Sequence, residues 1–179
     1  MHLVRDALPR PDDRRGVTAV AGRRVVVLVC GEPERGDDAA AFRAVELPAI
    51  AGLDGIEVRT CGALDVEDLL AVGPDEACLI VDAAVGVPAG RIVDGTLASL
   101  VSSGESQGGG PGPRSTHVLS VGDALALAAI LRPGLPPGAF VGIGGASFEL
   151  GEGLSPAVRP ALPSFADAIA ATIGRLAAS

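Results

Sequence analysis

The chain has 179 residues, of which 48% are hydrophobic and only 2% aromatic, so we expect one domain with a sizeable aliphatic core. Its net charge of −8, without a basic stripe, argues against a nucleic-acid partner and against docking on an anionic membrane. There is no apolar run near the ~20 residues of a membrane span and no apolar segment of the signal-peptide kind, so a cytoplasmic location is expected.

The N-terminal part of the chain divides into an extension and the start of a domain. Residues 1–22 have little periodicity and are expected to form a flexible extension, with the single domain covering 23–179. The β-branched run 25–29 predicts a strand buried on both faces, as in a parallel sheet. Gly31, Pro33 and Gly36 then mark a tight loop, and a helix is expected from about Asp38 to Leu47.

The loop after this strand is acidic. It contains Glu32, Glu34, Asp37 and Asp38, and it has neither the lysine of a P-loop nor the glycine spacing of a dinucleotide fold. Such a loop repels phosphate and attracts a divalent cation. The alternative is purely structural, with Asp37 as a helix N-cap and Asp38 as a favourable charge in the first turn.

The middle of the chain alternates strands with capped helices. An alternating strand is expected over 55–61 and ends at Gly62. Asp65, with Asp68 three residues later, predicts a capped helix over 66–72. The next strand, 78–84, is apolar until Asp82, a carboxylate that is costly to bury unless it is paired. Asp82 is therefore a candidate site residue, or else a cap on a neighbouring loop.

The C-terminal half continues the alternation. We expect an antiparallel edge strand over 90–97, a low-complexity mobile loop over 102–115, and His117 immediately after that loop. Ser120 predicts the cap of a helix that extends to about Leu131, and a glycine-rich strand follows over 139–146. Ser164 is the expected cap of the last helix, whose apolar face contains Phe165, Ile169, Ile173 and Leu176.

This order of elements predicts an α/β fold. About five mostly parallel strands, with an antiparallel edge strand, should form a three-layer α/β/α sandwich with helices on both faces. Ligands of such folds bind at the carboxyl ends of the strands. Cys30, Cys61 and Cys78 are widely spaced, without a C-x-x-C pair, and are expected to be small buried residues rather than zinc ligands or a disulfide framework.

Three segments together resemble one known family, the hydrogenase maturation proteases, which trim the C-terminus of the large subunit of [NiFe] hydrogenases. The segments are the loop 31–38 that ends in Asp38, the strand 79–83 that delivers Asp82, and the segment 115–119 that contains His117. The resemblance covers roughly residues 23–175. Two positions depart from the family pattern, since Glu32 stands where asparagine is usual and Ala39 where glycine is common.

The resemblance implies a function and a site. It implies an aspartic-type endopeptidase that recognises nickel already bound to the large-subunit precursor, through Asp38, Asp82 and His117. These residues would be the metal ligands and also the catalytic set, while Gly31, Glu32, Asp37 and Gly62 would bind substrate. Nickel would arrive with the precursor, the only expected partner, and the protein is expected to be a monomer.

The residues leave two other functions open. The departures at Glu32 and Ala39 fit a non-catalytic, nickel-dependent binding or chaperone module on the same fold. A small-molecule hydrolase on a similar scaffold is also compatible with the fold. There is no Ser-His-Asp constellation and no H-E-x-x-H helix, because the only other histidine is His2. Whether the metal polarises the scissile carbonyl or a carboxylate acts as general base is not decided by the sequence.

Overall fold

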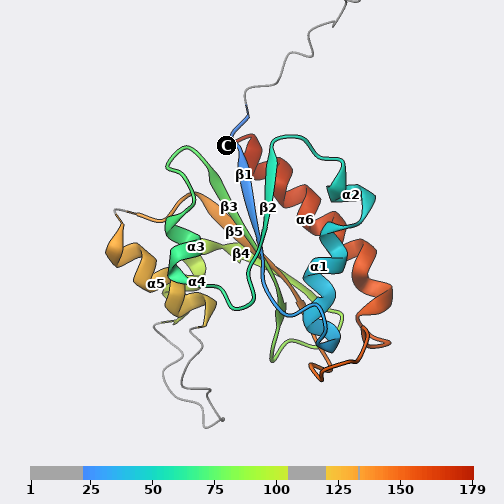
Figure 1. Ribbon diagram of the computed structural model, residues 1–179. Coiled ribbons are helices and arrows are strands. Elements are labelled where there is room, and N and C mark those ends of the chain that lie inside the picture. Colours follow the sequence, from blue (N-terminus) through green and yellow to red (C-terminus); the bar gives the residue numbers. More distant parts are fainter. Residues whose placement is uncertain (1–21, 105–119, 133) are drawn as a thin grey trace, which may run out of the picture.

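The computed structural model describes residues 22–104, 120–132 and 134–179. Five strands form one sheet in the order β2-β1-β3-β5-β4 (Figure 1). β1, β2, β3 and β5 run parallel, and β4 is antiparallel to β5 at one edge. The predicted mixed sheet is therefore confirmed. The strands are β1 (Val25–Val29), β2 (Ile56–Thr60), β3 (Ala77–Ala84), β4 (Ile92–Thr96) and β5 (Gly138–Gly144).

Helices cover both faces of this sheet. α1 (Ala40–Val45), α2 (Pro48–Ala51) and α6 (Leu162–Ala177) lie on one face, and α3 (Val66–Leu70), α4 (Leu97–Gly104) and α5 (Val121–Leu131) lie on the other (Figure 1). Successive side chains of a strand point to opposite faces of the sheet, so each central strand contributes to two hydrophobic cores, one under each helix layer. In β1, Val25, Val27 and Val29 enter the core beneath α1, α2 and α6, while Val26 and Leu28 enter the opposite core.

The burial of each strand matches its place in the sheet. All five residues of β1 are buried, as are the first five of β3, because both strands are central and covered on both sides. β2 is an edge strand, as predicted, and each of its residues is half-buried or exposed. The central position of β1 and β3 matters for function, because the acidic loop follows β1 and Asp82 lies near the end of β3.

Local signals predicted two helix starts correctly. Asp65 and Asp68 form a reciprocal capping box at α3, and Ser120 and Asp123 form another at α5. The predicted cap at Ser164 is wrong. α6 begins at Leu162 after Ala161, because a proline early in a helix is favourable at the position that Pro163 occupies.

Two other predicted boundaries also need correction. The helix expected from Asp38 to Leu47 is three pieces, a 3₁₀ turn η1 (Gly36–Ala39) followed by α1 and α2. Leu47 is extended, since the residue before a proline avoids the helical region, and Pro48 then starts α2. Residues 102–104, expected in the long loop, continue α4.

Some predictions fall outside the part of the chain that the structure describes. These are the extension over residues 1–21, the rest of the loop 102–115, and His117. Within the described residues, no helix is long and apolar enough to span a membrane.

Candidate active site

A cavity of about 410 Å³ opens at the carboxyl ends of β1 and β3, where α/β folds bind their ligands. Three acids lie on its wall: Glu32 from the loop after β1, Asp38 from η1 and Asp82 from β3. The loop after β1, the loop after β2, the start of α5 and the segment after β5 supply the rest of the wall. The lining residues are Cys30, Gly31, Glu32, Arg35, Asp38, Gly62, Ala63, Leu64, Asp82, Ala83, Val85, Ser120, Val121 and Phe148.

Asp38 is oriented by the backbone of its own loop. The N–H of Glu32 donates a hydrogen bond to Asp38 Oδ2, with 2.9 Å between nitrogen and oxygen. Burial raises the pKa of Asp38 above its ordinary value, and the Glu32 carboxylate adds to this effect. The Glu32 N–H and the charge of Arg35 oppose it without cancelling it. Asp38 is thus a partly desolvated carboxylate, and one of its two oxygens is hydrogen-bonded to the backbone of its own loop.

Asp82 is the more strongly perturbed acid. Burial raises its pKa from 3.8 to about 6, the charge of Asp38 adds to the shift, and the N–H of Ala83 partly offsets it. That N–H donates to Asp82 Oδ1 over 2.7 Å. A carboxyl group with this pKa, beside a second acid in a cleft, is typical of a functional site. The pair can hold a cation or exchange a proton near neutral pH.

Glycines allow the acids and the backbone to come close. Gly31 has a φ of +108°, and a β-carbon there would lie 2.5 Å from the carbonyl oxygen of Asp38. Its N–H donates to the carbonyl of Gly62 at 2.8 Å, which ties the end of β1 to the end of β2. A β-carbon on Gly62 would lie 3.1 Å from Glu32 Oε1. The three residues predicted to bind substrate on this wall, Gly31, Glu32 and Gly62, are therefore brought together.

Substituting Gly31 with alanine should destabilise the folded chain at this cavity wall. We expect Gly31→Ala to lower the free energy of unfolding by about 1–3 kcal/mol more than Gly55→Ala, because the new methyl group overlaps the Asp38 backbone. Gly55 is a matched control, since it also has a positive φ, +75°, but nothing lies within 4 Å of its β-carbon position. Urea denaturation of both variants measures the difference, and equal losses would contradict it.

Asp37, expected to bind substrate, does not lie on the cavity wall. Its side chain is fully buried, at 0% exposure. Oδ2 accepts the N–H groups of Ala146 (2.7 Å) and Ser147 (3.2 Å), and Oδ1 accepts the N–H of Ser155 (2.7 Å). Burial raises the pKa of Asp37, but these bonds outweigh it and keep the pKa below its usual range. The structure thus places Asp37 away from the cavity, where its carboxylate holds the segment 146–155.

That segment brings residues to the site that the sequence did not indicate. Phe148 lines the cavity, and its carbonyl accepts a hydrogen bond from Arg35 Nε at 3.1 Å. Arg35 also pairs with Leu150 in an isolated antiparallel bridge. No local sequence pattern predicts these contacts. Cys30 is buried as predicted, but it also lines the cavity. Ala39 has a φ of −74°, which a residue with a β-carbon adopts without strain.

The residues that the structure describes include only two of the three expected metal ligands. Among the residues that the structure describes, no group of three or more histidine, cysteine, aspartate or glutamate side chains is placed to hold a metal ion. Asp38 and Asp82 share the cavity, and His117 lies outside the described residues. Arg35 is the one basic residue among the described residues on the cavity wall. Asp38 and Asp82 are half-buried, and Arg35 offsets little of their negative charge, so they favour a cation and fit the carboxylate part of a metal site.

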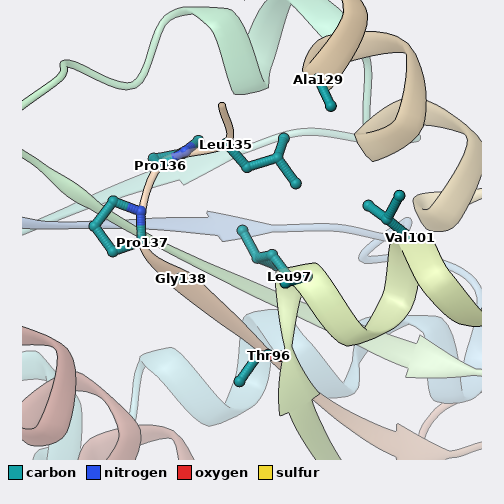
Figure 2. A pocket seen from close by; sticks show the side chains of 9 residues that line it. Thr96, Leu97, Val101, Ala129, Leu135, Pro136, Pro137 and Gly138 are labelled. Carbon is teal, nitrogen blue, oxygen red and sulfur yellow. The ribbon is translucent and has the colours of Figure 1, made fainter. Parts of the chain in front are cut away.

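A larger cavity of about 570 Å³ lies elsewhere, between α4, α5 and the start of β5 (Figure 2). Its side chains are almost all aliphatic, and no titratable group lines it. Of these two cavities, only the smaller one, which Asp38 and Asp82 line, offers groups for acid–base chemistry. The residues that line the larger one are Thr96, Leu97, Ala98, Val101, Ala129, Leu135, Pro136, Pro137 and Gly138.

Fold and site together define an α/β sandwich with an acid pair at the carboxyl ends of its two central strands. Solved structures of hydrogenase maturation proteases have this fold. The hydrogenase maturating endopeptidase HybD from E. coli aligns with a TM-score of 0.67 and 22% identity, over 85% of this chain and 93% of that one. The [NiFe] hydrogenase maturation protease HybD from Thermococcus kodakarensis aligns with a TM-score of 0.62 and 22% identity, over 86% and 99%.

A third solved structure gives a similar result. The [NiFe] hydrogenase maturation protease HycI from Thermococcus kodakarensis aligns with a TM-score of 0.60 and 19% identity, over 87% of this chain and 95% of that one. No protein-family model matches the sequence, and no curated protein matches it. The resemblance stated from the sequence is confirmed at the level of the fold, which by itself does not determine function.

Proposed function

We propose that this chain is an endopeptidase that removes the C-terminal peptide from the large-subunit precursor of a [NiFe] hydrogenase after nickel insertion. Asp38, Asp82 and His117 recognise the nickel that the precursor carries. The protein acts in the cytoplasm, as a monomer. The fold of the solved maturation proteases supports this proposal. The observation that carries it is the convergence of Asp38 and Asp82 on one cavity, where burial raises the pKa of both.

The nickel belongs to the substrate in this proposal. Two carboxylates and an imidazole are an acceptable but incomplete ligand set for nickel, and they leave positions for ligands from the precursor. Ser120, three residues after His117, lines the cavity with the two acids. When bound, the metal holds the precursor so that its scissile peptide lies beside the carboxylates.

The residues of the chain then have distinct tasks. The N–H of Glu32 holds Asp38 so that one carboxylate oxygen is fixed and the other is available. In the free chain Asp82 has a pKa of about 6 and is ionised at neutral pH, so it can bind the nickel and, with an oxygen that the nickel leaves open, accept a proton from the attacking water. Leu64, Val121 and Phe148 on the wall limit the access of other water molecules.

A cleavage assay tests the function. The chain is incubated with a hydrogenase large-subunit precursor in nickel-loaded and nickel-free forms, and intact mass reports the loss of a C-terminal peptide. We expect cleavage of the nickel-loaded form only, and cleavage reduced by at least about 100-fold in Asp38→Asn, Asp82→Asn and His117→Ala. Asp94→Asn removes an exposed acid from β4 and should retain activity. Cleavage of the nickel-free form at the same rate would overturn nickel recognition.

One observation favours a binding module instead. Glu32 adds a carboxylate beside Asp38 and contributes to its raised pKa, where the resembling family has a neutral asparagine. An extra negative charge strengthens the attraction for a cation and alters the hydrogen bonds offered to substrate. If the nickel-loaded precursor binds but keeps its mass, and Glu32→Asn restores cleavage, then the native chain is a binding module.

A further inference from the structure

Cys30 and Cys61 form a thiol pair at the edge of the active-site cavity. Cys30 follows β1 and Cys61 follows β2, and their sulfur atoms are 3.5 Å apart. The two strands are parallel neighbours, with Val29 opposite Thr60, so the two cysteines occupy the next register position. Adjacent strands lie about 4.8 Å apart, which is within the range of Cα separations that a disulfide spans. Both cysteines are free thiols in this structure.

We propose that Cys30 and Cys61 are a reversible disulfide site, oxidised by low-molecular-weight disulfides, and that its closure reshapes the wall of the active-site cavity. In a protein that is expected in the cytoplasm, a disulfide of this kind forms transiently as a redox response and is not a permanent structural cross-link. The pairing is independent of the proposed function, whereas its effect on precursor cleavage rests on that function.

The two thiols differ in a way that suits sequential exchange. Cys61 is partly exposed, and its hydrogen bond with Cys30 lowers its pKa. Cys30 is 1% exposed, and the same hydrogen bond, together with burial, raises its pKa. The Cys61 thiolate therefore attacks the small disulfide and releases one thiolate. Cys30 then loses its proton and attacks the Cys61 sulfur, which forms the protein disulfide and releases the second thiol.

Closure moves the side chain of Cys30, itself a residue of the cavity wall, because the two sulfur atoms have to approach from 3.5 Å to about 2.05 Å. Each cysteine directly precedes a glycine of the wall, and the N–H of Gly31 is bonded to the carbonyl of Gly62. Gly31 in turn packs so closely on Asp38 that even a methyl group does not fit between them. Any shift of the Cys30 backbone that accompanies closure is therefore transmitted through Gly31 to Asp38.

Cys78 is a built-in control. It is fully buried in β3, whereas Cys61 is partly exposed, so glutathione should not reach Cys78 in the folded chain. Cys61 and Cys78 share the segment 60–91, which has no lysine or arginine before Arg91. Peptide mapping therefore needs a protease that cuts at acidic residues in addition to trypsin.

The test equilibrates the folded, full-length chain in mixtures of reduced and oxidised glutathione, quenches it with acid, and maps the cysteines by mass. We expect a Cys30–Cys61 linkage with the loss of two hydrogen atoms, full reversal by dithiothreitol, and a free Cys78. Cys78→Ala should retain the linkage. Cys61→Ala should abolish it, and Cys30→Ala should accumulate a glutathione adduct on Cys61. No linkage at any ratio, a lasting adduct on Cys61 of the native chain, or a linkage to Cys78 would each overturn the proposal.

A second arm measures the effect on the site. The oxidised chain, freed of glutathione, is compared with the reduced chain in cleavage of the nickel-loaded precursor. We expect the oxidised form to be roughly 10–100-fold slower, the loss that follows a displacement of about 1 Å in an active site. Cys61→Ala should give one rate after either treatment. Equal rates for the native chain would overturn the coupling to the cavity, whereas no cleavage by either form would refute the proposed function and leave the disulfide result standing.

Discussion

Asp82→Asn should make the folded chain more stable at neutral pH while reducing precursor cleavage by about 10²–10⁴-fold, the usual contribution of a catalytic acid or base. The stability gain arises because Asp82 is ionised at neutral pH in a place that disfavours its charge. A pKa that rises from 3.8 to about 6 corresponds to on the order of 3 kcal/mol of unfavourable free energy. Asparagine has the same shape and still accepts the N–H of Ala83.

The pH dependence of this gain has a definite sign. Below pH 3.8, Asp82 is protonated in both folded and unfolded chains, so its charge costs nothing. Between 3.8 and about 6 the folded chain holds the proton more tightly, and the stability contributed by this group falls as the pH rises. Above about 6 the full cost is present. The advantage of Asp82→Asn should therefore grow from pH 4 to pH 6 and then stay constant.

Urea denaturation of the native chain and Asp82→Asn at several pH values measures this directly, without metal or precursor. Asp94→Asn, at an exposed position of β4, is the control for the loss of one negative charge. A carboxyl titration by NMR adds a check on the pair, because Asp38→Asn should lower the pKa of Asp82 by removing the neighbouring charge. A stability loss in Asp82→Asn at pH 7 would contradict the argument.

This trade between stability and function is typical of active sites. A chain selected for stability alone would not keep three carboxylates in one cavity with a single arginine on the described part of its wall. Under the proposed function, a cation that arrives with the precursor would remove this penalty, and the unfavourable free energy of the free site would be recovered as binding energy.

The sequence predicted the features that depend on neighbouring residues. The capping boxes at Asp65 and Ser120 each involve partners three residues apart, and the buried runs of β1 and β3 are continuous. Asp38 and Asp82 were identified because each follows or ends such a run, and parallel strands bring their carboxyl ends to one edge. The family resemblance added His117, which lies outside the described residues.

What the sequence missed depends on contacts between distant segments. Arg35 and Phe148 are 113 residues apart, and the partners of the Asp37 carboxylate are 109 to 118 residues away. The approach of Cys30 and Cys61 requires the register of β1 on β2, which neither strand specifies alone. Two adjacent aspartates, indistinguishable in sequence, thus have different environments because one faces the cavity and the other faces the segment 146–155.

Those two aspartates should respond oppositely to the same substitution. We expect Asp37→Asn to lower the free energy of unfolding by about 2–4 kcal/mol, because an amide has one acceptor oxygen where the carboxylate uses two, and its NH₂ group opposes a buried N–H. Asp38→Asn should leave the stability unchanged or slightly raised, since burial disfavours its charge. Cleavage should be lost in Asp38→Asn, whereas Asp37→Asn should retain part of it at low temperature while folded.

The pH dependence again distinguishes the two residues. The pKa of Asp37 is depressed in the folded chain, so its contribution to stability is present above pH 3.8 and is lost as the pH falls through the lower folded pKa. The deficit of Asp37→Asn should therefore shrink in acid, in contrast to the advantage of Asp82→Asn, which grows as the pH rises. Denaturation midpoints of the three variants across pH measure both trends. A common response of Asp37→Asn and Asp38→Asn would mean that the segment 146–155 does not depend on the buried carboxylate, and that the division of roles between the paired aspartates is wrong.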